Sequence, residues 1–420
     1  MFPDRLFELA LQYKKTRLWK KLWDSQLFAV RFSDGEIGYC CVMGMNGEFN
    51  AIAVYPGQSG LDSLRTLHED ESEMDNLARI EQMCCQDCLM LSFVNKSDLN
   101  RRDMEALDAF ARKNGITLRG RNASPQFERF RPGYERWYLE DETDQRRMIE
   151  ALEAALEVAD RLSREMKTAE MLGITEDAPY DRDIVLLIRE PEGFRWDRVP
   201  LPPMAPADWP PVTVDDDLSR VRLEKAVRKG EWAVKLARHV EPAVPNLDSE
   251  EAIDYDDLTE PPIFPWFAMI VDVRSGDAIG LALSPCVEDY RPMLSKLLVD
   301  TVVKYGMPKK IIVLDDRTRM ALEVFCGQYE IGLVQKKRCK PLQEALDAMM
   351  ASFMETEDFD ELDDDEIDEM LDMLADPQAV QRLPDELLRM MLTHFDPDHF
   401  PREVMDNLRR EAIRREFIRK

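Results

Sequence analysis

Apolar and polar positions between Phe264 and Asp347 alternate in blocks that predict a regular order of strands and helices. Short apolar runs predict four strands: PWFAMIVDV, AIGLALSP, KKIIVLDD and IGLVQKK. Longer segments with apolar positions at helical spacing predict three helices: YRPMLSKLLVDTVVKYGMP, RTRMALEVFCGQY and PLQEALDAMMASFM. The stretch therefore predicts an α/β module in which two strands are followed by alternating helices and strands.

The N-terminal part of the chain shows the same mixture of periods. Its apolar spacing predicts helices over residues 4–25, 59–68, 74–85, 97–113 and 142–168, and strands over LFAVRF and residues 88–94. Asn46-Gly47 lies between two β-rich runs and predicts a hairpin turn, because Gly adopts the positive φ that tight hairpins require. Ser97 is expected to cap the helix that follows it, and Asn114-Gly115 to end that helix.

Prolines divide the middle of the chain. The segment DIVLLIREPEGFRWDRVPLPP predicts a hairpin, which runs into a proline-rich strap, residues 200–211, that cannot join a central strand. After the strap, Val214–Lys229 is predicted as a helix and Glu231–Val240 as a strand, and the acidic linker Glu241–Pro262 follows.

This pattern predicts an α/β (α+β) protein with two mixed-sheet domains and a helical C-terminal tail. The expected boundaries are an N-terminal α/β domain over 1–170, a second α/β domain over 180–352 that includes the strap, and an acidic helical tail over 353–420. Within the tail, residues 366–371, 386–391 and 403–408 repeat one amphipathic pattern and predict three short helices with methionine-rich faces. Such faces suit core packing or adaptable contact with a partner.

The charge of the chain excludes several classes of partner. It has 83 acidic and 56 basic residues, a formal net charge of −27, which repels nucleic acid and anionic membranes. No apolar run reaches the roughly 18–20 residues that span a bilayer, and the N-terminus lacks the basic-then-apolar order of a signal peptide. We therefore expect a cytoplasmic protein whose partner is another protein.

The cysteines contain one cluster with the spacing of a possible metal site, Cys84-Cys85-x-x-Cys88. A zinc site needs further Cys or His ligands. Cys40 and Cys41 are candidates, but adjacent residues of a strand point to opposite faces, so at most one of them could join. Buried, reduced thiols are the simpler interpretation.

The order of elements from Phe264 onward resembles part of the ribonuclease H-like fold of integrase and transposase cores. In that fold an Asp of the first strand meets an acid at the end of a later strand, a third acid comes from a later helix, and together they hold two divalent metals for phosphodiester chemistry. The resemblance implies a set drawn from Asp272, Asp315, Asp316, Glu344 and Asp347, which would bind Mg²⁺ or Mn²⁺ through oxygen ligands.

The chain also departs from that family. The family fold has three antiparallel strands before its first helix, and only two are predicted here unless Glu231–Val240 supplies the third. The acids have a structural interpretation as well, since Asp272, Asp315 and Asp316 fall at strand ends and a helix start. Asp316 is suited to cap the helix that follows it.

The chain as a whole resembles uncharacterised bacterial proteins that pair two domains of unknown function. The resemblance spans roughly residues 5–350 and depends on four segments: Asp34–Gly44, Cys88–Phe93, Val271–Gly280 and Gly306–Asp316. It implies no activity and no catalytic residue.

Two functional hypotheses follow. The first is a non-catalytic binding or regulatory protein without a cofactor, because no G-x-S-x-G, Walker loop or G-x-G-x-x-G motif occurs. The alternative is a divalent-metal-dependent nuclease or strand-transfer enzyme, with Asp272, Asp315 and Glu344 as catalytic residues and Asp272, Asp315 and Asp316 as metal ligands. The two differ in whether these carboxylates meet in space.

Overall fold

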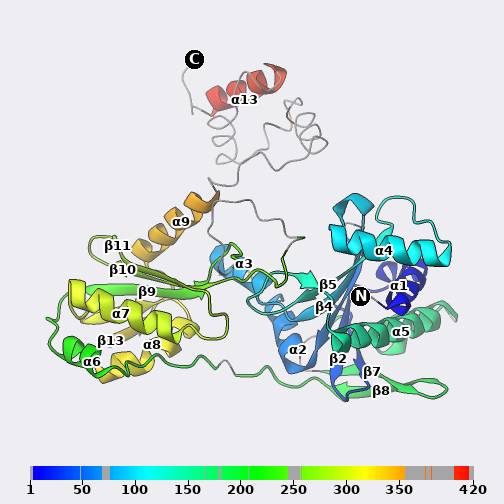
Figure 1. Cartoon of the computed structure of the whole chain (residues 1–420), viewed down its shortest axis with the longest axis horizontal. Helices are drawn as coiled ribbons and strands as arrows, with labels where there is room; N and C mark the ends of the chain where they lie inside the picture. The colour runs from blue at the N-terminus through cyan, green and yellow to red at the C-terminus, as the bar shows by residue number, and fades with distance from the viewer. Residues whose placement is uncertain are drawn as a thin grey trace. The chain divides into compact units, whose positions relative to one another are not determined.

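The chain is an α/β protein with two mixed β-sheets (Figure 1). The computed structural model describes residues 3–47, 49–68, 76–164, 166–177, 180, 182–206, 208–244, 256, 258–354, 374, 380 and 402–415. It divides into two compact units, Met1–Ala345 and Leu346–Lys420. Within the described residues, the first unit contains a sheet of eight strands and a sheet of five, and both are mixed, as the sequence predicts.

The first sheet has the strand order β6-β5-β4-β3-β2-β1-β7-β8. Its strands are β1 (Phe28–Arg31), β2 (Ile37–Met43), β3 (Ala51–Pro56), β4 (Cys88–Val94), β5 (Ser124–Phe130), β6 (Trp137–Tyr138), β7 (Asp183–Glu190) and β8 (Gly193–Pro200). Neighbouring strands are antiparallel except β1 and β7, which are parallel. The predicted β2–β3 hairpin is confirmed, and Gly47 in its turn has φ +88°.

Helices cover both faces of this sheet. The helices of the first domain are α1 (Asp4–Thr16), α2 (Gly57–Thr66), α3 (Asn76–Cys84), α4 (Arg101–Asn114) and α5 (Glu142–Arg164), with short 3-10 turns at Leu18–Lys20, Lys96–Asp98 and Glu170–Leu172. One core contains residues of α1, α4 and α5, and another contains residues of α2. Successive strand residues alternate between these cores: Cys40 belongs to the first and Cys41 to the second. This alternation explains why the central strands are apolar throughout.

Several local expectations need correction. The first helix ends at Thr16 rather than near residue 25, because Arg17 adopts a left-handed conformation with φ 51°. The cap of α4 is Asn100, whose side chain accepts from the backbone N–H of Asp103, and not Ser97. Gly115 ends α4 with φ 63°, as predicted. β5 and β6 are strands that the apolar pattern does not predict.

The hairpin over residues 183–200 belongs to the first sheet. The sequence analysis places it at the start of the second domain, but β7 pairs in parallel with β1 through Ala29↔Leu186, Val30↔Leu187 and Arg31↔Ile188. Val185 and Leu187 complete the core beneath α5, and Ile184 and Leu186 complete the core on the other face. A parallel partner so distant along the chain leaves no local signal in the sequence.

The proline-rich strap is held at both of its ends. Near its start, Arg65 of α2 donates to the carbonyl of Pro202 at 2.7 Å, and Asp62 accepts from the N–H of Ala205 at 3.1 Å. Near its end, the Tyr290 hydroxyl donates to the carbonyl of Pro210 at 2.7 Å. Val212 then enters the core of the second sheet.

The second sheet has the strand order β11-β10-β9-β12-β13. Its strands are β9 (Glu231–Arg238), β10 (Trp266–Asp272), β11 (Ala278–Ser284), β12 (Lys310–Val313) and β13 (Gly332–Gln335), and its helices are α6 (Asp217–Glu224), α7 (Arg291–Tyr305), α8 (Asp316–Gln328) and α9 (Lys340–Met354). β9, β10 and β11 are antiparallel, whereas β9, β12 and β13 are parallel. All seven elements predicted from Phe264 onward are confirmed, and Glu231–Val240 supplies a third antiparallel strand.

The second unit is described at the end of α9 (residues 346–354), at α13 (Arg402–Arg414) and at a few further positions. Val404, Leu408 and Ala412 are buried at successive turns of α13, which confirms the helix predicted over 403–408. Asn407 donates to the carbonyl of Leu374 at 3.2 Å. The segments 366–371 and 386–391 lie outside the described residues. No helix in the described part of the chain is long and apolar enough to cross a membrane.

A buried carboxylate joins α3 of the first domain to the second sheet. Glu81 is 7% exposed, forms an ion pair with Arg317 of α8, and accepts from the backbone N–H of Arg238 at 3.0 Å. The two guanidinium groups lie against indole rings: Arg238 is 3.7 Å from the centroid of Trp266, and Arg317 is 4.5 Å from that of Trp209. Burial lowers the pKa of Arg238 to about 10, although Glu81 opposes this effect. Glu81 therefore pairs with the half-buried Arg317 and stabilises the charge of the buried Arg238 nearby.

We predict that Glu81→Gln destabilises the protein by about 3 kcal/mol, because the substitution removes the carboxylate that pairs with Arg317 and that lies near the buried Arg238. The free energy of unfolding, measured in urea with tryptophan fluorescence, checks this value. Glu105→Gln on the exposed face of α4 is the matched control and removes the same charge. Equal stability of the two variants would contradict the assigned role.

Candidate functional site

A cavity of about 350 Å³ lies in the first domain, between the start of α4 and the edge of its sheet. Its lining residues come from the turn before α4, from α4, from β5 and β6, and from the loop between these strands: Asp98, Asn100, Asp103, Gln126, Phe127, Glu128, Glu135, Arg136, Trp137 and Tyr138. Four of them are acidic and one is basic. The volume lies within the range of small-molecule and side-chain binding pockets.

Local structure places the two most buried acids of the cavity wall on different elements. Asp103 occupies the first turn of α4, where Asn100 caps the helix and also donates its side-chain amide to the Asp103 carboxylate at 2.9 Å. Glu128 lies on β5 and pairs in register with Tyr138 of the short edge strand β6. Asp103 is 5% exposed and Glu128 is 7% exposed. Both acids are therefore shielded from water without a buried cation beside them.

Burial changes the protonation of these acids. It raises the pKa of Asp103 to about 6, and the nearby charge of Glu128 adds to the effect while Asn100 opposes it. Burial also raises the pKa of Glu128, although Arg136 opposes this change. Desolvation and mutual repulsion both disfavour the charged forms. A cation entering the cavity would relieve both costs.

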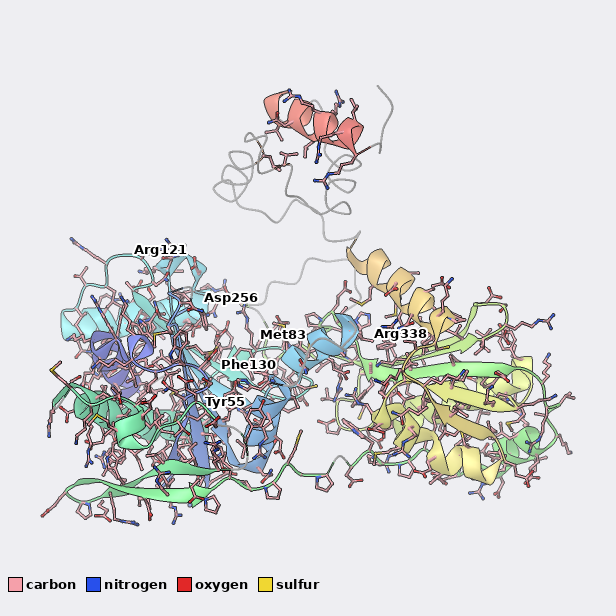
Figure 2. The ribbon with its side chains drawn as sticks, turned by 180° about the vertical axis from the view of Figure 1, so that it is seen from behind. Tyr55, Met83, Arg121, Phe130, Asp256 and Arg338 are labelled. Atoms are coloured by element: carbon pink, nitrogen blue, oxygen red, sulfur yellow. The ribbon has the colours of Figure 1, made fainter. Side chains whose placement is uncertain are left out.

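Aromatic rings form another part of the wall. The Trp137 and Tyr138 rings meet edge to face, with centroids 4.9 Å apart. The Tyr138 hydroxyl donates to Asp256 (labelled in Figure 2) at 3.3 Å, and Asp256 also accepts from the backbone N–H of Arg101. Burial and Asp256 raise the pKa of Tyr138 to about 12, so its hydroxyl stays neutral at physiological pH. Ring faces beside carboxylates are an arrangement that favours cations.

The loop between β5 and β6 is fixed by hydrogen bonds on both sides. The N–H of Gly133 donates to the carbonyl of Cys84 at 3.0 Å, and the carbonyl of Gly133 accepts from Phe264 at 2.8 Å. Glu135 donates its N–H to the carbonyl of Pro262 at 2.9 Å. Gly133 has φ +81°, and a Cβ atom there would lie 2.9 Å from the Arg238 guanidinium and 2.6 Å from Val287. Only glycine fits this position.

The acids that the sequence analysis proposes for metal binding lie elsewhere, and two of them are far apart. Asp272 ends β10 and pairs with Trp232 near the start of β9. Asp315 follows β12, and its carboxylate binds Lys235 at 3.1 Å, three residues further along β9. That offset is roughly 10 Å at strand spacing. The structure therefore places Asp272 and Asp315 toward opposite ends of the sheet.

The hydrogen bonds and ion pairs of these acids give each of them a structural role. Asp272 accepts the backbone N–H groups of Arg274 and Ser275 at 3.0 Å each, which closes the turn before β11. Asp315, rather than Asp316, caps α8 by accepting the N–H of Thr318 at 2.7 Å. Burial would raise the pKa of Asp315, but Lys235 and Thr318 lower it below its ordinary value.

The remaining predicted acids are on exposed positions of helices. Asp316 contacts Arg319 at 3.4 Å, Glu344 binds Lys340 at 3.2 Å, and Asp347 is exposed. Across the described residues, no group of three or more His, Cys, Asp or Glu side chains could hold a metal ion. The donor set implied by the ribonuclease H resemblance does not assemble.

The cysteine cluster consists of shielded thiols. Cys84 and Cys88 are buried and Cys85 is half-buried. Burial raises the pKa of Cys84 to about 12 and that of Cys85 to about 11, and it also raises the pKa of Cys88. Burial therefore disfavours the thiolate form of all three side chains. A structural role in the cores fits these surroundings.

Sequence reasoning missed the cavity. SPQFERF, which forms β5, alternates polar and apolar residues, and an acid at Glu128 beside the aromatic pair Trp137-Tyr138 was the available signal. The pattern is short and is interrupted by charged residues, so it resembles an exposed loop. Only the packing of α4 against the sheet edge shows that Asp103 and Glu128 share one cavity.

Comparison with known proteins identifies both domains. Residues 4–176 match the family model of a domain of unknown function (DUF7309), and residues 219–350 match that of another domain of unknown function (DUF6930). A search of the curated proteins finds no match. The chain thus pairs two domains of unknown function, as the sequence analysis expects, and the cavity lies wholly within the first of them.

Proposed function

We propose that this chain is a non-catalytic binding or regulatory protein whose first domain accepts a basic side chain of a partner protein. The observation that supports this proposal is the cavity between α4 and β5, in which Asp103 and Glu128 are buried and their pKa values are raised. Buried carboxyl groups that are incompletely compensated lower the stability of a fold. A bound cation would remove this cost, and the free energy recovered would add to the binding affinity.

Charge and size both favour a cationic partner group. Four acids and one arginine line the cavity, and the chain as a whole has a formal net charge of −27. Such a field repels nucleic acid and accelerates association with basic proteins. The Trp137 and Tyr138 rings can lie against an alkyl stem or a cationic head.

We also propose that the second domain has a ribonuclease H-like fold that serves a structural role here. β9, β10 and β11 provide the three antiparallel strands that precede the first helix in that fold. Lys235 of β9 stands beside the carboxylate of Asp315, where the family fold brings a first-strand acid. A lysine ammonium neutralises Asp315 and competes with a cation for it. The residues present therefore do not fit a two-metal centre.

The binding proposal predicts selective affinity for cationic probes. N-acetyl-lysine methylamide and N-acetyl-arginine methylamide should shift the amide NMR signals of residues around the cavity, whereas the uncharged N-acetyl-norleucine methylamide should not. Glu128→Gln should weaken binding of the cationic probes by about tenfold or more, because a buried carboxylate partner is lost.

Glu105→Gln is the matched control for this measurement, since Glu105 is an exposed acid of α4 that does not line the cavity. It should leave probe affinity unchanged. Equal affinity for the norleucine probe, or equal weakening by both substitutions, would show that the cavity does not select charge.

The raised pKa of Asp103 predicts an unusual dependence of stability on pH. The folded protein retains a proton on Asp103 up to about pH 6, whereas the unfolded chain releases it near its ordinary pKa of 3.8. This group therefore makes the free energy of unfolding fall as pH rises from about 4 to 6. Asp103→Asn should raise that free energy by about 2 kcal/mol at pH 7.5 and have a smaller effect at pH 4.5. Thermal melts at both pH values check the prediction, and an effect independent of pH would contradict it.

The Lys235–Asp315 pair predicts a compensating double substitution. Asp315→Asn retains a capping side chain but leaves the buried Lys235 without its counter-charge, at a cost of about 3 kcal/mol. Adding Lys235→Met should recover most of that loss, because a similar apolar stem replaces the orphaned ammonium. Urea unfolding of the two single variants and the double variant measures the coupling. Additive losses would mean that the pair does not act as a unit.

A further inference from the structure

Arg136 is the basic residue of the cavity wall, and its contact with the buried acid is loose. Its Nη1 atom lies 3.6 Å from Oε1 of Glu128, beyond ordinary hydrogen-bond length. The side chain of Arg136 is 64% exposed, whereas that of Glu128 is 9% exposed. An exposed ion pair of this kind is weak and exchanges readily. Glu128 therefore has a partner that can be displaced at little cost.

A second guanidinium of the chain touches another wall of the same cavity. Arg102 lies over the ring of Tyr138, 4.1 Å from its centroid, and also pairs with Glu140. Two side chains of the cavity wall, the Tyr138 ring and the Glu128 carboxylate, are thus each in contact with a guanidinium group of the chain. A planar guanidinium matches such surfaces better than an ammonium, because it stacks on rings and is more weakly hydrated.

We propose that the partner's group is a guanidinium, an arginine side chain, and that Arg136 is the internal ligand that it displaces from Glu128. This inference depends on the proposed function. In the free protein Arg136 partly compensates Glu128 from the rim. When a partner arginine enters, Arg136 moves into solvent, and Glu128 and Asp103 gain a cation within the cavity. Glu128 therefore has one cationic partner before the exchange and one after it.

The test compares two probes on two variants of the full chain. N-acetyl-arginine methylamide and N-acetyl-lysine methylamide are titrated into the native protein, into Arg136→Gln and into Arg121→Gln, and affinity is read by NMR. Arg121 (labelled in Figure 2) is an exposed arginine of the same domain that does not line the cavity. We expect Arg136→Gln to bind the arginine probe about three- to fivefold more tightly, the range that loss of an exposed competing ion pair allows. Arg121→Gln should match the native protein, and the lysine probe should bind more weakly throughout.

A readout without ligand separates the two proposals. The side-chain carboxyl signal of Glu128, followed by NMR against pH, should titrate at a higher pH in Arg136→Gln, because the nearby cation is gone. If that shift occurs but arginine affinity is unchanged or weaker, Arg136 is not the displaced ligand. If the lysine probe binds as tightly as the arginine probe, selection for guanidinium is wrong. If neither probe binds any of these proteins, the proposed function itself fails.

Discussion

The compensation of buried charge at Glu81 is the interaction on which the arrangement of the first unit depends. A single carboxylate from α3 meets Arg317 and the backbone of Arg238, and both guanidinium groups are held against Trp266 or Trp209. Arg238 also donates to the carbonyls of Phe264 and Val287. Since the indole faces hold both guanidinium groups in place, α3 must supply its carboxylate at one position.

Neighbouring contacts hold the loop that lines the cavity. Gly133 of the β5–β6 loop donates to Cys84, at the end of the helix that contains Glu81, and accepts from Phe264. Its Cα lies so close to Arg238 that no side chain would fit. The loop that ends in Arg136 is therefore positioned by residues of the second domain, and the pocket of the first domain depends on its neighbour. Two domains of unknown function in one chain thus share a structural reason to be paired.

Local periodicity predicted most of the elements, and long-range pairing explains most of the differences. Strands and helices from Phe264 onward follow from blocks of apolar residues, because each element buries one face or two. The partner of the 183–200 hairpin could not be predicted, since the β1–β7 pairing joins residues far apart in the sequence. The same limit applies to the candidate acids. Asp315 and Asp272 end strands of one sheet, but β10 and β12 run in opposite directions, so the two acids lie apart. Lys235 reaches Asp315 only because β9 lies beside β12, and the sequence does not show that pairing.

The two buried acids of the cavity differ from other shielded acids of the chain in the partners that neutralise them. Arg129 compensates Asp87 at 2.7 Å and Asp144 at 3.0 Å, and Lys235 compensates Asp315 at 3.1 Å. In these clusters the cation is buried (Lys235) or only slightly exposed (Arg129), so packing holds the pair in place. At Asp103 the hydrogen-bonding partner is a neutral amide, and at Glu128 the ion-pair partner is an exposed arginine 3.6 Å away. Asp103 and Glu128 lack such a shielded cationic partner among the described residues, and their burial therefore costs stability. Two protonatable carboxyl groups in a space the size of a side chain fit the proposed binding role. They lower the stability of the free protein, and a bound ligand would restore it.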